Sequence, residues 1–311
     1  MGATMAMWAS LARGLIILGV AWAAAAAPAG AQDLEPRAFA NTPVGLNFLI
    51  GGYAYADGTV GTDAAVPLED TEVQVDTAAL AYVRTLDLWG RSGKVDVILP
   101  YGWAFGSTKF AGQEKRRDVS GLADPRFRVS TLLLGGPALS LEEFRDFKPD
   151  WIVGVSFEVT VPLGEYDSDK LLNIGTNRWS FKPELGISKT IEPFTLELTT
   201  GVRFYTENDD FFGGKTLALS PLYSVQMHAI YSFTPGLWLG LDGVYYTGAQ
   251  PTISGRRGES EENARIGLTC TLPVNAHNAV KVYGSTGLYS KTGTDFDMIG
   301  INWQFRWGAG L

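Results

Sequence analysis

Residues 151–163 read WIVGVSFEVTVPL, in which apolar side chains alternate with polar or small ones. Side chains of an extended chain point to opposite faces at successive positions, so a period of two is typical of a β-strand. One face would carry Trp151, Val153, Val155, Phe157, Val159, Val161 and Leu163, and the other Gly154, Ser156, Glu158 and Thr160. The pattern therefore predicts a strand with one apolar and one polar face.

The same period recurs along the whole chain after the first forty residues. It predicts twelve strands, at residues 44–56, 73–86, 94–106, 124–134, 150–163, 177–189, 194–206, 220–233, 237–249, 262–272, 279–290 and 295–307. A tilted strand needs roughly 9–11 residues to cross a bilayer, and each of these segments is long enough. With 46% hydrophobic and 19% charged residues, the 311-residue chain is not a disordered protein.

The connections between the predicted strands indicate how they are arranged. Short turns at 87–93, 190–193, 234–236 and 273–278 alternate with long polar loops at 57–72, 107–123, 164–176, 207–219 and 250–261. An even number of strands with this alternation is typical of a transmembrane antiparallel up-and-down β-barrel, with short periplasmic turns and long extracellular loops. The short connection at 291–294 departs from the pattern. The long connection at 135–149 does too, and its capping box from Ser140 to Glu143 predicts a short periplasmic helix.

The first thirty-one residues have the features of a cleavable signal peptide. Arg13 precedes an apolar run from Gly14 to Ala27, and Ala29-Gly30-Ala31 forms a small-residue cleavage site. A membrane anchor is the alternative, but the run is shorter than the ~20 residues of a spanning helix. We therefore expect a periplasmic tail at residues 32–43, within a barrel domain at 32–311. The expected location is the outer membrane of a Gram-negative bacterium, reached with the help of the outer-membrane barrel assembly machinery.

A soluble β-sandwich or lipocalin-like barrel is the alternative fold, with the apolar faces turned inward. Aromatic residues gather at the ends of the predicted strands, as they do in the interfacial girdles of membrane barrels. They include Trp89, Trp103, Trp151, Trp179, Trp238, Trp303, Trp307, Tyr53, Tyr205, Tyr245 and Tyr246. This distribution favours the membrane barrel.

Composition excludes several classes of function. A net charge of −8 with a pI near 4.9 argues against a nucleic-acid partner. One cysteine allows neither an internal disulfide nor a cysteine-rich zinc site. His228 has Ser224 and Ser232 on its face, but nothing in the sequence completes a catalytic set. We expect no catalytic residues, no cofactor and no bound metal.

If the apolar faces contact lipid, the polar faces line the lumen. The candidate lumen-lining residues are Arg126, Arg128, Glu158, Lys182, Glu184, Glu197, Arg203, His228, Asp242, Arg265, Lys281 and Arg306. One interpretation is a structural network of ion pairs that fills a narrow barrel. The other is a polar conduit whose charges select a solute, and a twelve-strand barrel lies between the filled and the open sizes.

Several motifs resemble one family of proteobacterial proteins. They are Leu34-Glu35-Pro36-Arg37-Ala38, Pro43 to Phe48, Leu122 to Arg126, Pro162 to Asp167, Asn173 to Gly186 and Asn208 to Gly214. The family is named as outer-membrane transporters of the meta-pathway of phenol degradation. The resemblance covers essentially the whole chain after the signal peptide, and residues 173–186 are its most specific part. It implies an outer-membrane barrel with a transport role, and it carries no catalytic residues.

Three hypotheses for function follow. The first is a channel for the passive uptake of small aromatic or hydrophobic solutes through a charged lumen. The second is a closed structural or adhesive barrel whose loops contact partners or lipopolysaccharide. For that barrel, Lys109, Lys115, Arg116 and Arg117 could bind lipid phosphates. The third is a lipid-modifying enzyme.

Overall fold

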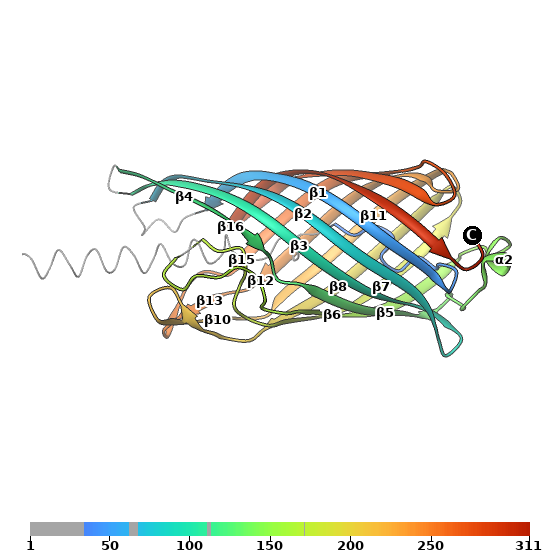
Figure 1. Ribbon diagram of the computed structural model, residues 1–311, viewed down its shortest axis with the longest axis horizontal. Helices are drawn as coiled ribbons and strands as arrows, with labels where there is room; N and C mark the ends of the chain where they lie inside the picture. The colour runs from blue at the N-terminus through green and yellow to red at the C-terminus, as the bar shows by residue number, and fades with distance from the viewer. Residues whose placement is uncertain (1–33, 62–67, 111–112, 171) are drawn as a thin grey trace, which may run out of the picture.

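The chain forms a closed antiparallel β-barrel (Figure 1). The computed structural model describes residues 34–61, 68–110, 113–170 and 172–311. The expected signal peptide, residues 1–31, lies outside the described residues. Within the described part of the chain, no helix is long and apolar enough to cross a membrane.

The wall follows the chain from one strand to its neighbour. Its elements are β1 (Leu46–Gly61), β2 (Leu68–Leu88), β3 (Arg91–Phe110), β4 (Gln113–Leu122), β5 (Arg126–Leu134), β6 (Trp151–Thr160), β7 (Ser180–Ile191), β8 (Phe194–Tyr205), β11 (Leu222–Thr234), β12 (Leu237–Gly248), β15 (Glu261–Pro273) and β16 (Asn278–Gly308). A second, small sheet contains β9 (Asn208–Phe211), β10 (Lys215–Leu219), β13 (Pro251–Ile253) and β14 (Arg256–Arg257).

The barrel closes between its first and last strands. β1 pairs with β16 over the whole span from Leu46↔Gly308 to Gly61↔Gly293, and the blue and red ribbons meet there in Figure 1. β16 supplies two wall strands, since its first half pairs with β15 and its second half with β1. β4 and β5 pair with successive parts of β3 and together form one wall strand. The pairing is interrupted between them, where Pro125 has no N–H to donate. All twelve predicted strands are present, so the prediction of a twelve-stranded barrel is confirmed.

The two faces of the wall differ as their period of two requires. In β6, Phe157 is 49% exposed on the outside, whereas the neighbouring Glu158 is 3% exposed on the inside. The same contrast recurs in β7 and β11, where exposed and buried positions alternate. An apolar outer surface around a polar interior is the arrangement that lipid requires, because charges facing hydrocarbon would be costly.

The two ends of the barrel carry different structures. Helix α2 (Leu141–Phe144) lies at the end where the chain terminates, and β10 and β13 lie at the other end (Figure 1). The predicted capping box is present, since Ser140 Oγ accepts from the Glu143 N–H at 3.3 Å and Glu143 Oε2 accepts from the Ser140 N–H at 2.8 Å. By the expected topology, the α2 end is periplasmic and the small sheet is extracellular.

The extracellular connections contain more strand than expected. β1, β2 and β3 run well into the predicted loops at 57–72 and 107–123, and β4 forms a hairpin with β3. Main-chain pairing does not need an apolar face where water solvates both sides, so the alternation that reveals a strand in lipid disappears beyond the membrane. The side chains of Lys109 and Lys115 lie outside those described.

Candidate functional site

The barrel interior contains most of the charged side chains predicted to line it. Glu158, Lys182, Glu184, Arg203, His228, Asp242 and Arg265 are each at most 9% exposed. Arg126, Arg128, Glu197 and Lys281 are partly buried on the same inward face. Arg306 is placed differently, because its Nε donates to the Ala276 carbonyl at 2.6 Å in the periplasmic turn. That side chain therefore holds a turn at the barrel rim.

A network of ion pairs joins β6, β7 and β8. Arg203 Nη2 lies 3.0 Å from Glu158 Oε1, and Arg203 Nη1 donates to Ser180 Oγ at 2.9 Å. On the neighbouring positions, Lys182 Nζ lies 2.6 Å from Glu184 Oε1, and Ser156 Oγ donates to Glu184 Oε2 at 2.9 Å. The strand register places Glu158 opposite Lys182 and Ser156 opposite Glu184. These charges are therefore matched within the wall itself.

A histidine and two partners form a second network on β11, β12 and β15. Asp242 Oδ1 lies 2.7 Å from His228 Nδ1, and Asp242 Oδ2 accepts from Thr269 Oγ1 at 2.6 Å. His228 Nε2 is buried without a hydrogen-bond partner among the described residues, so this nitrogen is not paired with Ser224 or Ser232. Arg265 Nη2 donates to Ser285 Oγ at 3.0 Å. Within the described chain, no cluster of three or more His, Cys, Asp or Glu side chains could hold a metal ion.

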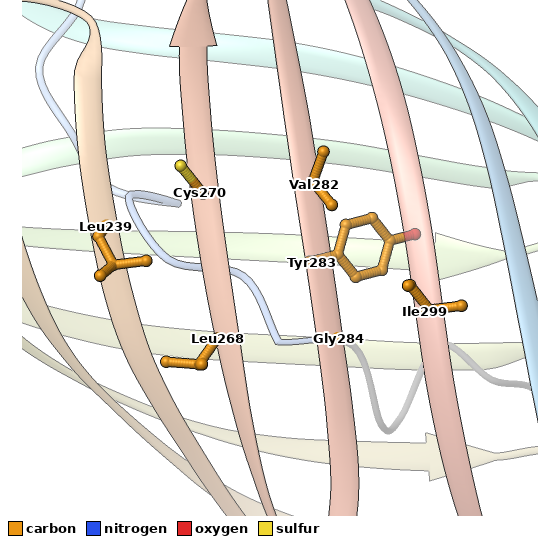
Figure 2. A pocket seen from close by; sticks show the side chains of 7 residues that line it. All are labelled: Leu239, Leu268, Cys270, Val282, Tyr283, Gly284 and Ile299. Atoms are coloured by element: carbon orange, nitrogen blue, oxygen red, sulfur yellow. The ribbon is translucent and has the colours of Figure 1, made fainter.

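The N-terminal segment, residues 34–43, lies inside the barrel, which corrects the expectation of a periplasmic tail at residues 32–43. Its Glu35 N–H donates to Gln226 Oε1 at 3.2 Å, and its Arg37 N–H donates to Glu197 Oε2 at 2.7 Å. Lys94 Nζ donates to the Ala38 carbonyl at 3.0 Å. In Figure 2, a segment in the pale blue of the N-terminal residues runs behind β15 and β16.

The segment has both a polar and an apolar anchor. Arg128 bonds to Glu35 through Nη1 and to Asp96 through Nε, the second at 2.7 Å. Phe39 is 7% exposed and packs with the buried Leu132 and Ile152 near the periplasmic end. Its ring lies against Gly154 and Gly186, where a Cβ would approach it within 2.4 Å and 2.1 Å. These two inward glycines therefore leave the space that Phe39 occupies.

The charge of Glu35 is stabilised by its surroundings. Burial alone would raise the pKa of Glu35, but the nearby Arg128, Lys182 and Arg126 charges outweigh it and hold this pKa well below its usual range. Glu35 therefore stays ionised at neutral pH and keeps its bond to Arg128.

The extracellular end of the interior is covered by the connection between β6 and β7. Asp124 fixes this connection, since its Oδ1 accepts from the Gly164 N–H at 2.9 Å and its Oδ2 accepts from Thr176 Oγ1 at 2.6 Å. Arg117 Nε donates to the Leu172 carbonyl at 3.0 Å. Arg117, one of the four residues that could bind lipid phosphates, thus bonds to this connection.

Two charged residues at this end were not among the predicted lumen residues. Arg178 is 4% exposed, with its guanidinium carbon 5.4 Å from the centre of the Tyr205 ring, and Glu261 is 7% exposed at the start of β15. Glu261 continues the inward series of Asn263 and Arg265, so the period of two could have identified it. Arg178 lies in an irregular connection, where no periodic signal exists.

The outer surface of the wall contains an apolar hollow. Leu239, Leu268, Cys270, Val282 and Ile299 surround a shallow hollow at Gly284, with a volume of about 220 Å³ (Figure 2). The hollow lies on the outer surface that faces lipid, so it is separate from the charged interior. Cys270 is a free thiol in this wall.

Known structures share this architecture. The COG4313 outer membrane channel from Pseudomonas putida F1 has 18% sequence identity and a TM-score of 0.75, over 88% of this chain and 100% of that one. The transport unit of the autotransporter AIDA-I from Escherichia coli has 9% identity and a TM-score of 0.55, over 92% and 97%. At these identities the likeness is one of fold.

Sequence comparison identifies the family. No curated protein sequence matches the chain. A family model described as "Putative MetA-pathway of phenol degradation" matches residues 54–299, which is well over half of the 311 residues. The chain belongs to this family.

Proposed function

We propose that this protein is a passive outer-membrane channel for small aromatic or hydrophobic solutes, which cross through its charged lumen. The observation that carries the proposal is the filling of the barrel interior by residues 34–43, a segment that is not part of the wall. Eight strands enclose an interior that side chains can fill, whereas twelve enclose a wider one. A wall of this size therefore surrounds a passage that a separate segment narrows.

The contacts that hold the segment are of a kind that water can replace. The polar contacts are hydrogen bonds and an ion pair to Arg128, Glu197, Gln226 and Lys94, and they act beside the apolar contacts of Phe39 and Leu34. A single hydrogen bond contributes only about 0.5–1.5 kcal/mol net, because water competes for both partners. The segment can therefore move while the main-chain pairing of the wall remains intact. The solute class is supported by the family description, which refers to phenol degradation.

Bilayer recording and liposome swelling test this proposal. We expect a small unitary conductance from purified protein and permeation of neutral aromatics such as phenol into liposomes. Glu35→Gln removes the charge that bonds to Arg128, so it should raise the mean conductance. Glu142→Gln on the exposed face of α2 is the matched control and should leave it unchanged. Silent bilayers and no swelling, from protein shown to be folded, would contradict the proposal.

A closed structural barrel is the second candidate, and the pairing of the interior charges favours it. Glu158, Lys182, Glu184 and Arg203 all have partners within the wall. In that case the exposed hairpin of β3 and β4 would bind lipopolysaccharide, and the lumen would conduct nothing. Either function implies insertion by the barrel assembly machinery of the outer membrane.

A further inference from the structure

Two charged side chains at the extracellular end of the interior are buried without an ion pair to any described residue. Arg178 is 4% exposed and Glu261 is 7% exposed. Arg178 Nε has no hydrogen-bond partner, and neither charged group forms an ion pair with any described residue. The paired charges deeper in the barrel show that this chain can match its charges where the wall requires it. The unpaired ones at the mouth need a different explanation.

The position of Arg178 is fixed by its neighbours along the chain. Thr176 is bound to Asp124, and Asn177 Nδ2 donates to Asn208 Oδ1 at 2.9 Å. Since Asp124 already accepts from Gly164 and Thr176, it provides a nearby charge without bonding to the guanidinium. Burial lowers the pKa of Arg178, although the nearby Tyr205, Asp124 and Glu261 partly offset this.

Aromatic and aliphatic side chains face inward from the wall strands that separate the two charges in the sheet. Arg178 precedes β7 and Glu261 begins β15, and the intervening strands β8, β11 and β12 are neighbours in the wall. Tyr205, Leu222 and Tyr246 face inward from those three strands and pack together in one cluster. Leu34 of the N-terminal segment packs against the same cluster. The mouth therefore has an apolar surface with a cation at one side and an anion at the other.

A buried charge is costly unless it is paired and hydrogen-bonded. The planar guanidinium presents a fork of N–H donors that matches a carboxylate, and the Glu261 carboxylate can accept from a hydroxyl group. A flat ring suits the tyrosines between them, since aromatic pairs attract when stacked or edge to face. A ligand that satisfies all three features has a carboxylate, an aromatic ring and a hydroxyl group on the far side of the ring.

We propose that Arg178, Tyr205, Tyr246 and Glu261 form a binding station for hydroxylated aromatic carboxylates at the extracellular mouth. The carboxylate bonds to Arg178, the ring lies on the tyrosines, and the hydroxyl donates to Glu261. Leu34 must leave the tyrosines for the solute to enter, so binding competes with the N-terminal segment. The station deepens the proposed channel function and rests on it, because a solute bound at the mouth continues inward through the lumen.

Calorimetric titration of the purified protein in detergent tests the station, with 4-hydroxybenzoate, benzoate and 4-hydroxybenzyl alcohol as probes. The wild-type protein should bind 4-hydroxybenzoate at least about tenfold more tightly than either analogue, since each lacks one polar partner. Arg178→Gln should abolish the preference over the alcohol, and Glu261→Gln should reduce the preference over benzoate, because a neutral amide oxygen is a weaker acceptor than a carboxylate. Arg178→Lys should restore part of the first preference. Arg256→Gln, on the exposed strand β14, is the control and should change nothing.

The wild-type series alone can overturn the inference, even if a variant fails to fold. Equal affinity for the three probes, or no binding of any of them, contradicts it. So does a preference that persists unchanged in both Arg178→Gln and Glu261→Gln. Conductance in potassium chloride separates the two proposals. A conducting protein without this preference refutes the station alone, whereas a silent barrel with the preference refutes the channel alone.

Discussion

The middle of the barrel interior and its extracellular mouth differ in whether their buried charges form ion pairs. In the middle, Glu158 on β6 is bonded to Arg203 on β8, and Lys182 is bonded to Glu184 within β7. At the mouth, Arg178 and Glu261 are equally buried but unpaired among the described residues. Charges in the middle therefore stabilise the wall, and their removal should damage the fold. Charges at the mouth serve something other than the fold, and their removal should leave the barrel intact.

The largest expected effect contrasts Glu158 with Glu261. Glu158→Gln leaves the Arg203 guanidinium buried beside a neutral amide, which should cost about 3–5 kcal/mol of the free energy of unfolding. Glu261→Gln removes a buried charge that forms no ion pair with the described residues, so this free energy should stay unchanged or rise. Urea titration of protein folded into phospholipid vesicles measures both. A similar loss in both variants would abolish the distinction between the two regions.

The outer wall provides the next contrast, between membrane depth and membrane edge. Val155→Arg places a charge on the outer face in the middle of β6, at an expected cost of about 2–4 kcal/mol. Leu163 is 68% exposed beyond the end of β6, so arginine there should cost no more than about 1 kcal/mol. The same urea titrations decide it. Equal costs at the two positions would mean that β6 does not cross the membrane at this depth.

A pH titration of conductance concerns the segment that links the two regions. Because the pKa of Glu35 is held below its usual range, its bond to Arg128 is fully present above the ordinary glutamate value of about 4.3. The bond is lost only as the pH falls through the lower value in the folded protein. Conductance should therefore be constant from neutral pH down to about 4 and rise in stronger acid. Glu35→Gln should remove this rise. If the variant and the wild-type protein have identical pH profiles, the bond between Glu35 and Arg128 does not control conductance.

The smallest effect is expected at the periplasmic rim. Lys189 bonds to Asp150 there, but the Asp150 side chain is 71% exposed. Asp150→Asn should change the free energy of unfolding by less than about 1 kcal/mol, because water and salt screen an exposed pair. The ammonium would keep its position 5.2 Å above the Trp151 ring. A loss comparable to that of Glu158→Gln would show that burial does not separate the strong pairs from the weak ones.

The wall of the barrel could be predicted from sequence because the alternation of apolar and polar residues is visible within each strand alone. A single layer separates lipid from the interior, so every second residue must be apolar wherever the chain crosses it. The alternation in Trp151–Thr160 therefore gives the strand, its two faces and its place in a membrane barrel without any knowledge of its neighbours. The capping box at Ser140 is equally local, and it gave the position of α2.

The contents of the barrel depended on the tertiary structure. Glu35 and Arg128 are 93 residues apart, and only closure of the barrel around the N-terminal segment brings them together. Arg306 occupies an inward position of its strand, as Arg203 does, yet its bond to the Ala276 carbonyl depends on the nearby periplasmic turn. Arg178 lies in a connection without a repeating pattern, and its burial beside Tyr205 follows from how that connection packs. Alternation along a strand specifies which face a residue occupies, whereas register, curvature and inserted segments specify which residue it meets.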